Sequence, residues 1–384
     1  MKILMLAPEP FFEPRGTPIS VYFRILALGE LGHSVHLVTY PLGQDVRLKN
    51  LKIIRPPNLF FIRTVKIGPS LIKVPLDFLL LLRASFELTA TRYDVIFSHE
   101  EAGFFGTVLA KIWGKPHIYD MHSSLPQQLE NFKFTQSAFL ISLFRKMEDF
   151  VLRNSRAVIV ICQDLLEKVA KPGYGRKAVL IENFLDFPSQ EFSAEEISQK
   201  KRELARHGEK IVLYAGNFEP YQGILLLLEA ARNVREKALF LLVGGSGTAL
   251  GEMKEMAAKL GLTERAVFVE RVPPSRVPFY VALADVLVSP RLTGTNTPLK
   301  IYSFLKSGKP LVATNLWTHT QVLNPTYAIL AEPDARALAE GISFALNSEE
   351  ARSRARAAAE WARKEFTLPR YLERIAQVLD KAKS

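Results

Sequence analysis

A hydroxyl-rich loop between residues 289 and 303 has the residue types best suited to binding a phosphate. It follows the apolar run Val286–Ser289, which predicts a buried strand, and it opens a predicted helix near Lys300. The start of a helix exposes main-chain N–H groups and a partial positive charge, and both favour an anion. Lys300, in the first turn, would add a full positive charge. The predicted binding residues here are Thr295, Asn296, Thr297, Pro298, Leu299, Lys300 and Ser303.

Two loops in the first half of the chain also follow predicted strands. Gly16 joins the first strand to the first helix, where a glycine permits a tight turn and the close approach of a ligand to the main chain. His122 ends another strand, two residues after Asp120, which could orient it. A structural turn at Gly16 and a structural histidine at 122 are the alternatives to a binding role.

Two glycine-containing loops in the second half follow the same rule. Gly216, Asn217 and Gln222 lie between a predicted strand and a predicted helix. Gly244 ends the next strand, at the start of a glycine-rich turn. Such turns after strands suit phosphate groups, although a glycine cluster alone is weak support.

Short apolar runs alternate with amphipathic stretches along the chain. The runs are rich in Val, Ile and Leu without strict alternation, which is typical of strands covered on both faces. Helical patterns such as Ile19–Leu31 and Ile224–Val234 lie between them, and this order favours parallel sheets. The predicted strands are Ile3–Ala7, Ser34–Thr39, Val95–Ser98, His117–Asp120, Ala157–Ile161, Ile211–Ala215, Leu239–Gly244, Ala266–Val269, Val286–Ser289 and Leu311–Thr314.

The strand–helix series begins twice, at Met1 and again at Ile211, which predicts an α/β fold with two Rossmann-like domains. We expect one domain at residues 1–185, a second at residues 186–365 and a terminal helix within residues 366–384. Ligands of open α/β sheets bind beyond the carboxyl ends of the strands. Two such domains facing each other would therefore bring the informative loops to one cleft.

Composition narrows the class of protein. The chain has 384 residues, of which 48% are apolar and 23% charged, as in ordinary globular proteins. Cys162 is the single cysteine, so no internal disulfide can form and a reducing cytoplasm is the expected compartment. The apolar runs fall short of the roughly 18 uncharged residues that a membrane-spanning helix requires.

A basic, apolar segment between Arg47 and Arg92 contains nine basic and two acidic residues, within a chain of net charge +11. Apolar runs such as Leu59–Ile62, Leu71–Ile72 and Phe78–Leu82 interleave with these charges. Basic residues beside exposed apolar ones favour an anionic membrane surface. No recognised nucleic-acid motif accompanies them, so nucleic acid is not an expected partner. A helix hairpin packed on a sheet, with solvated lysines outside, is the alternative.

Short motifs from Leu239 to Thr314 occur in a specific order. They are Val-Gly-Gly-x-Gly, Leu-Gly-Leu, Arg-Val-Pro, Val-Pro-x-Tyr, Ala-Asp-Val and Ser-Gly-Lys-Pro. This combination resembles retaining GT-B glycosyltransferases, family 4 in particular, and the resemblance extends over nearly the whole chain. It implies a nucleotide-sugar donor in the second domain, an acceptor in the first, and a terminal helix that crosses back to the first domain.

The resemblance also implies roles for individual residues. His122 matches a histidine that the family places over the donor sugar, and Gly16 lies where the family approaches the transferred sugar or the acceptor. Main-chain groups at Arg271 and Val272 would contact the nucleotide base. Lys300 belongs to a Pro-x-Lys sequence that some family members share.

Four positions depart from the family pattern. Thr295 and Ser303 stand where the family usually has two glutamates separated by seven residues. Asn217 and Gln222 stand where it typically has an arginine and a lysine that neutralise the diphosphate. All four replacements are neutral and polar, so hydrogen bonding could survive while Lys300 becomes the main cation.

The implied activity is transfer of a sugar from a nucleotide-diphosphate donor with retention of its anomeric configuration, with His122 and Lys300 as catalytic residues. The family usually needs no metal ion, because helix N-termini and basic side chains hold the diphosphate. We therefore expect no cofactor and no metal. A lipid-linked or cell-surface saccharide is the expected acceptor, as in polysaccharide biosynthesis, with the protein in the cytoplasm or on the inner face of the membrane.

Two other functions compete with this one. The four altered positions are compatible with an inactive, glycosyltransferase-like protein that binds sugar nucleotides. A nicotinamide-dependent oxidoreductase would use the turn Gly245–Gly247 and Glu270 as a ribose-binding acid. Gly251 comes one position too late for that fingerprint, and no catalytic Tyr-x-x-x-Lys or hydride-site constellation stands out. A sugar-nucleotide epimerase on the same fold is a further alternative.

Overall fold

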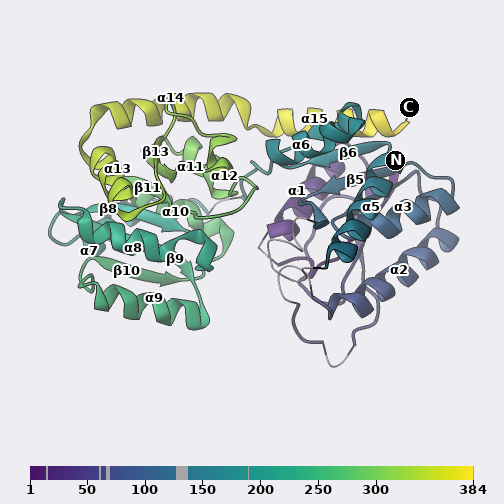
Figure 1. Ribbon diagram of the computed structural model, residues 1–384, viewed down its shortest axis with the longest axis horizontal. Coiled ribbons are helices and arrows are strands. Elements are labelled where there is room, and N and C mark those ends of the chain that lie inside the picture. Colours follow the sequence, from purple (N-terminus) through teal and green to yellow (C-terminus); the bar gives the residue numbers. More distant parts are fainter. Residues whose placement is uncertain (14–15, 60–61, 66–69, 127–136, 189, 384) are drawn as a thin grey trace. The chain divides into compact units, whose positions relative to one another are not determined.

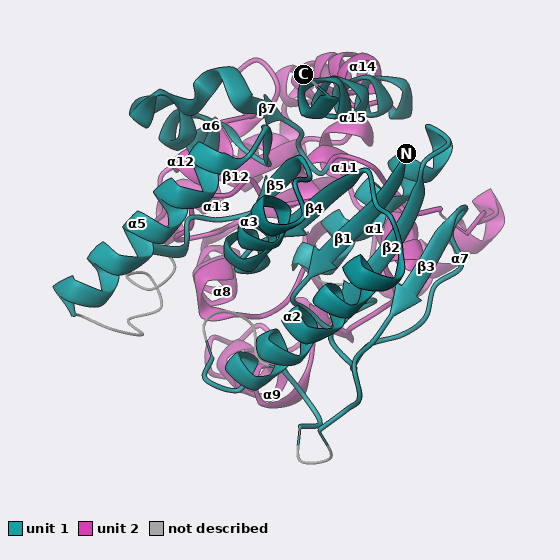
Figure 2. Cartoon of the chain, turned by 90° about the vertical axis from the view of Figure 1, so that its right-hand side faces the viewer, with its two compact units in different colours: residues 1–183, 368–384 teal, residues 184–367 magenta. Residues whose placement is uncertain are grey.

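A computed structural model describes residues 1–13, 16–59, 62–65, 70–126, 137–188 and 190–383 (Figure 1). The chain divides into two compact units, shown in different colours in Figure 2. Unit 1 comprises Met1–Asn183 together with Leu368–Ser384, and unit 2 comprises Phe184–Thr367. The chain therefore crosses between the units twice, near the domain limits expected at residues 185 and 365.

Unit 1 is built on a parallel sheet whose strand order is β3-β2-β1-β4-β5-β6-β7 in the described residues. Residues Ile3–Ala7 of β1 are buried, and Leu6 of that strand pairs with Val38 on one side and Ser98 on the other. Strands buried in this way need apolar residues on both faces, as the sequence predicts. The strands are β1 Lys2–Ala7, β2 Ser34–Thr39, β3 Leu51–Ile54, β4 Val95–His99, β5 His117–Met121, β6 Ala157–Val160 and β7 Ala178–Leu180.

Helices cover the sheet of unit 1. The carboxyl-terminal helix α15 packs on α1 and β6, with Ile375 and Val378 buried. Short π and 3-10 turns at Ala170–Tyr174 and Gly175–Lys177 follow α6. The helices are α1 Gly16–Glu30, α2 Lys73–Ala90, α3 Ala102–Ile112, α5 Ala138–Asn154, α6 Gln163–Val169 and α15 Leu368–Lys383.

Within its described residues, the basic, apolar segment between residues 47 and 92 does not form the helix hairpin that was one alternative. Its described part forms the edge strand β3 and the single long helix α2. An edge strand leaves main-chain groups unpaired on its outer side, and a strand of only four residues keeps the number of these groups small. Phe60, Phe61 and Lys66 of the segment lie outside the described residues.

Unit 2 has a second parallel sheet, with the order β10-β9-β8-β11-β12-β13 in the described residues. Its core joins the strands to α8 and α13 through buried side chains such as Phe240, Leu227 and Ile342. The strands are β8 Lys210–Ala215, β9 Ala238–Gly245, β10 Ala266–Glu270, β11 Val286–Ser289, β12 Leu311–Thr314 and β13 Ile329–Ala331.

Three helices of unit 2, α7, α13 and α14, begin with a side-chain cap. Asp334 caps α13 by accepting main-chain hydrogen bonds from Arg336 and Ala337, and Ser348 caps α14 in the same way. The helices are α7 Ala194–Leu204, α8 Ile224–Asn233, α9 Gly247–Lys259, α10 Val277–Leu283, α11 Lys300–Lys306, α12 Trp317–Thr320, α13 Ala335–Asn347 and α14 Glu349–Glu365, with 3-10 turns at Pro220–Gln222 and Pro274–Arg276.

Each sheet has one point where the strand order reverses. In unit 1 the reversal lies between β1 and β4, and in unit 2 it lies between β8 and β11. Open α/β sheets bind ligands beyond the carboxyl ends of the strands at such a point. The loops that carry Gly216 and residues 290–299 follow β8 and β11, so the fold directs attention to the same residues as the sequence does.

None of the described helices combines the length and the apolar character that crossing a bilayer requires.

Candidate functional site

The loop between β11 and α11 is held by side chains of the segment around α12. Thr318 Oγ1 donates a hydrogen bond to the main-chain carbonyl of Asn296 at 2.7 Å. Gln321 Nε2 donates to the carbonyl of Thr295 at 2.6 Å. These two bonds fix the path of the hydroxyl-rich loop without using its own side chains, which favours a preorganised binding surface.

Arg291 braces the same loop from within. Its Nε donates to the carbonyl of Thr293 at 2.8 Å and its Nη1 donates to that of Asn296 at 3.2 Å. Gly294 has a φ angle of +125°, which favours glycine, and its Cα lies against the guanidinium of Arg291. Burial lowers the pKa of Arg291. The sequence analysis did not single out this residue, although its position directly after β11 is the signal that would have found it.

Lys300 carries a buried amino group with an aromatic neighbour. Its Nζ atom lies 3.9 Å from the centre of the Tyr214 ring, at a distance typical of a cation–π contact. Burial, followed by the charge of nearby Arg291, holds the pKa of Lys300 well below its usual value. Helix α11 begins at Lys300, as expected, but it has only seven residues, so its dipole adds little beyond the local N–H groups.

Three buried polar atoms of the predicted site have no hydrogen-bond partner within the described part of the chain. They are Gln222 Oε1, Thr297 Oγ1 and Lys300 Nζ. Buried polar groups in proteins are nearly always paired, because an unpaired one costs about 1–3 kcal/mol. Three such atoms on predicted binding residues indicate a site built to receive a polar ligand.

Two glycines bring the strand-end loops together. Gly216 and Gly244 have φ angles of +155° and +114°. A Cβ atom at Gly244 would lie 2.4 Å from the carbonyl oxygen of Gly216, and one at Gly216 would lie 3.1 Å from Lys300 Nζ. The main chain after β8 and the main chain at the end of β9 therefore touch, and Lys300 lies against Gly216.

The remaining residues of unit 2 that the sequence predicts to bind the nucleotide sugar differ in their exposure and in their hydrogen bonds. The exposed Asn217 accepts a hydrogen bond from the Tyr214 hydroxyl through its main-chain carbonyl at 2.6 Å. Ser303 Oγ donates to the carbonyl of Lys300 at 3.0 Å, within its own helix. The N–H of Arg271 donates to Gly245 at 3.1 Å, so this donor is already used within the unit. Pro298 is buried, whereas Leu299 and Val272 are half-buried.

A neutral histidine lies beneath the loop. His319 Nε2 is 2.9 Å from Ser289 Oγ, and its Nδ1 is 3.1 Å from Thr314 Oγ1. Burial, together with the charges of Lys300 and Arg291, lowers the pKa of His319 to about 4, although a hydrogen bond to the carbonyl of Thr314 acts in the opposite direction. An uncharged imidazole in this place supports the loop without adding a positive charge.

His122 is buried at the carboxyl edge of the sheet in unit 1. Its Nε2 atom lies 3.4 Å from Asp120 Oδ1 and 3.2 Å from His99 Nδ1. Asp120 also accepts a hydrogen bond from the buried guanidinium of Arg24 at 2.9 Å. Burial raises the pKa of Asp120, but the charges of Arg24, His122 and His99 together lower it below its usual value, so the carboxylate is ionised.

The same three side chains could in principle hold a metal ion. Ligand atoms of His99, Asp120 and His122 all lie within 4.8 Å of one another. However, the Arg24 guanidinium already neutralises Asp120, and a second cation would be repelled at this distance. We therefore assign the three residues to a hydrogen-bonding network.

Glu100 connects the two predicted loops of unit 1. It has a φ angle of +47°, and its carboxylate accepts hydrogen bonds from Ser123 Oγ at 2.8 Å and Thr17 Oγ1 at 3.5 Å. Gly16, an exposed residue with φ +46°, precedes Thr17, so Glu100 links the loop of Gly16 to that of His122. The sequence analysis missed Glu100, which follows β4 directly. Pro14 and Arg15 lie outside the described residues.

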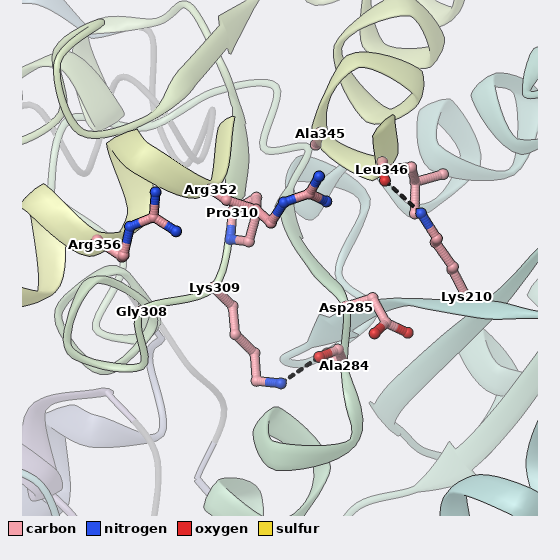
Figure 3. A pocket seen from close by; sticks show the side chains of 10 residues that line it. All are labelled: Lys210, Ala284, Asp285, Gly308, Lys309, Pro310, Ala345, Leu346, Arg352 and Arg356. Atoms are coloured by element: carbon pink, nitrogen blue, oxygen red, sulfur yellow. Dashed lines mark hydrogen bonds between the residues drawn. The ribbon is translucent and has the colours of Figure 1, made fainter. Parts of the chain in front are cut away.

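A separate pocket of about 280 Å³ opens at the opposite edge of the unit 2 sheet (Figure 3). Its lining includes Lys210, Lys309, Arg352 and Arg356, beside the amino ends of β8, β11 and β12. The two lysines donate to main-chain carbonyls, and both arginines bind Glu349. Because these cations already have partners and lie away from the strand ends, we do not assign the donor to this pocket.

Comparison with protein families agrees with the fold. Residues 195–361 match the model described as "Glycosyl transferases group 1", and residues 15–187 match "Glycosyltransferase Family 4". The two matches correspond to unit 2 and unit 1. The chain is a glycosyltransferase of the GT-B class. It belongs to the glycosyltransferases described by these two models, as the motifs had suggested.

Individual relatives are distant. Alpha-monoglucosyldiacylglycerol synthase of Streptococcus pneumoniae is 22% identical over 324 residues, which cover 82% of this chain and 71% of the relative. The putative colanic acid biosynthesis glycosyl transferase WcaI of Escherichia coli is 25% identical over 51% of this chain and 50% of its own length. The crystal structure of Anabaena Alr3699/HepE in complex with UDP has a TM-score of 0.77 at 18% identity and covers 99% of this chain and 100% of that one.

Proposed function

We propose that the chain transfers a sugar from a nucleotide-diphosphate donor held at the carboxyl edge of the unit 2 sheet, with retention of the anomeric configuration. The observation that carries this proposal is a group of three buried polar atoms, on Gln222, Thr297 and Lys300, that have no hydrogen-bond partner among the residues described. In a nucleotide sugar, phosphate oxygens would accept hydrogen bonds from Thr297 and Lys300, and a ribose or sugar hydroxyl would donate one to Gln222 Oε1. The HepE structure, which was solved with UDP, supports a nucleotide in this fold.

The arrangement can stabilise a leaving diphosphate without a metal ion. Negative charge grows on the leaving phosphate in the transition state, and preorganised donors near it lower the barrier. Lys300 would supply the ammonium group, and main-chain N–H groups beside Gly216 and after Thr295 would supply neutral donors. Arg291 would hold the loop in place, since its own donors already bind main-chain carbonyls. We expect activity to persist in the presence of a metal chelator.

His122 would contact the transferred sugar from unit 1. Ionised Asp120 fixes the imidazole, so His122 can present its other face to a sugar hydroxyl. The donor phosphate itself would accept the proton of the acceptor hydroxyl, so the reaction would need no separate protein base.

A thermal-shift screen with UDP, GDP, ADP and TDP sugars tests the donor site, because a ligand that binds the folded state raises its stability. We expect one nucleotide class to stabilise the protein and Lys300→Ala to remove that effect. Lys309→Ala is the matched control. Burial also lowers the pKa of Lys309, but this residue lies near the amino ends of the strands, away from the proposed donor site. Equal stabilisation of wild type and Lys300→Ala would remove Lys300 from the mechanism.

We further propose that the acceptor is a lipid-linked or cell-surface saccharide, reached at an anionic membrane surface on the inner face of the membrane. Support comes from α2, whose exposed apolar residues recur every four positions: Val74, Phe78, Leu82 and Phe86. Phe104, Val108 and Ile112 repeat this spacing on α3, which contacts α2. Arg92 and Lys111 are exposed at the ends of these helices. Apolar stripes with adjacent basic residues favour anionic lipid surfaces.

Flotation with anionic vesicles at low and high salt tests this surface. We expect binding to anionic but not to neutral vesicles, and loss of binding in the double variant Phe78→Ser, Phe86→Ser. Phe344→Ser, at an exposed phenylalanine of unit 2, is the control. Absence of vesicle binding by the wild-type protein would contradict a membrane-bound acceptor.

An inactive sugar-nucleotide-binding protein is the second candidate, and the neutral residues at 217, 222, 295 and 303 favour it. The same screen, followed by a turnover assay with the stabilising donor, separates the two. Stabilisation without hydrolysis or transfer across lipid and saccharide acceptors would favour the binding protein.

A further inference from the structure

One buried guanidinium in unit 1 has a partner for each of its nitrogens. Arg24, on α1, is fully buried. Its Nε donates to Asp120 Oδ2 at 2.9 Å, its Nη2 donates to the carbonyl of Ile181 at 2.9 Å, and its Nη1 contacts the hydroxyl of Tyr371. A planar arginine with three fixed partners holds them in a defined geometry, which a lysine could not do.

Two of these partners lie beside the points where the chain passes between the units. Ile181 precedes the first crossing, which follows Asn183. Tyr371 lies on α15 shortly after the second crossing, which follows Thr367. Arg24 therefore contacts both the segment that leaves unit 1, at Ile181, and the segment that returns to it, at Tyr371.

The third partner leads to the candidate site. Asp120 Oδ2 binds Arg24, while Asp120 Oδ1 lies 3.4 Å from His122 Nε2. A displacement of the guanidinium would therefore move the carboxylate that lies beside the imidazole. Because these atoms are buried, water cannot replace a lost contact to Arg24, so we expect Asp120 and then His122 to move with the guanidinium.

We propose that Arg24 and Tyr371 are positioning residues for His122, and that they connect the two chain crossings between the units to the orientation of that imidazole. A movement of either crossing would change the placement of His122. The consequence for catalysis rests on the role given to His122 under the proposed function, whereas the structural connection does not.

The test compares two tyrosine-to-phenylalanine variants. Tyr371→Phe removes the hydroxyl that contacts Arg24. Tyr174→Phe is the matched control, because the Tyr174 hydroxyl binds Asp149 Oδ1 at 2.6 Å and Lys177 lies over its ring, also in unit 1. Both variants lose one hydrogen bond to a charged group and keep the ring. Labelled histidine ring resonances, assigned with a His122→Gln variant, report the state of His122 without any substrate.

We expect the ring resonances of His122 to shift in Tyr371→Phe and to stay in place in Tyr174→Phe. Arg24→Lys should shift them further, because lysine keeps the positive charge but lacks the planar guanidinium group that reaches all three partners. With a donor identified, kcat of Tyr371→Phe should fall about tenfold with a smaller change in donor KM, since misorientation of a catalytic group acts mainly on the chemical step.

Unchanged His122 resonances in folded Tyr371→Phe and Arg24→Lys would overturn the connection. Shifted resonances with unchanged turnover would support the connection and overturn the role of His122 in the reaction. Should Arg24→Lys fail to fold, the Tyr371→Phe comparison still decides, because a phenylalanine keeps the ring and its packing against α1.

Discussion

The side-chain nitrogen of Lys300 lies 3.9 Å from the centre of the Tyr214 ring and has no hydrogen-bond partner in the described parts of the chain. The ring lies against the amine in the free protein and would stabilise its ammonium form once an anion binds. Tyr214→Leu keeps an apolar side chain but removes the ring, so we expect donor affinity to fall about 2- to 30-fold, the equivalent of a cation–π contact. Titration calorimetry with the stabilising donor measures this loss.

Tyr214→Phe is the control for that experiment. It keeps the ring under Lys300 and removes the hydroxyl that donates to the carbonyl of Asn217. We expect a donor affinity within about twofold of wild type, because the hydrogen bond from the Tyr214 hydroxyl to Asn217 does not involve the bound nucleotide sugar and contributes little on balance. An equal loss in both variants would show that the hydroxyl, rather than the ring, supports the site.

The lowered pKa of Lys300 predicts proton uptake when the donor binds. Burial and Arg291 favour the neutral amine in the free protein, whereas a diphosphate beside it favours the ammonium form. Binding must then add a proton, so donor affinity should fall as pH rises between the two pKa values. Calorimetry in buffers of different ionisation enthalpy measures the number of protons, and Lys300→Met should abolish the uptake.

The stability of the free protein should move in the opposite direction. A lysine whose pKa is lower in the folded state binds fewer protons there than in the unfolded chain, so its contribution to stability rises with pH until the ordinary lysine pKa is passed. Lys300→Met removes an unpaired buried amine and should raise the free energy of unfolding by about 1–3 kcal/mol. A destabilised Lys300→Met variant would contradict the assignment of Lys300 as a binding residue kept at the expense of stability.

The central strands were predictable because they are buried on both faces. Runs such as Ile3–Ala7 and Ile211–Ala215 contain uninterrupted apolar residues, and they became β1 and β8. The sequence analysis missed β3, β7 and β13, which all lie at sheet edges and have only three or four residues. Such short strands are partly exposed, so neither length nor periodicity marks them in the sequence, whereas the five-residue edge strand β10 was predicted.

The candidate site was predictable only as far as strand ends define it. The rule that ligands bind beyond the carboxyl ends of strands is enough to choose Gly216, Gly244 and Lys300. It cannot show that Arg24 reaches Tyr371, 347 positions later in the chain, or that Arg291 turns its donors onto its own loop. Such contacts depend on which buried groups meet across the fold, and no local pattern encodes them.

Thr297→Val is expected to separate binding from stability. The Thr297 hydroxyl is buried and lacks a partner among the described residues, so replacing it with a methyl group of similar size should not reduce the free energy of unfolding. Donor affinity should fall about 3- to 10-fold, the equivalent of one hydrogen bond. Thr314→Val is the control, since the Thr314 hydroxyl donates to the carbonyl of Arg291 at 2.5 Å and its loss should destabilise the loop.

Gly244→Ala should disrupt the site through the main chain. Its φ angle is +114°, and a Cβ atom there would lie 2.4 Å from the carbonyl oxygen of Gly216, a contact that neither backbone can relieve without moving. We expect a loss of about 1–3 kcal/mol in the free energy of unfolding, measured by urea denaturation, together with loss of donor binding. Gly251→Ala is the control, because this glycine lies within α9 with open space around its Cβ position, and alanine should stabilise the helix by about 0.5–1 kcal/mol. If Gly244→Ala were as stable as Gly251→Ala, the close approach of the two strand-end loops would be refuted, and with it the geometry that brings Gly216 against Lys300.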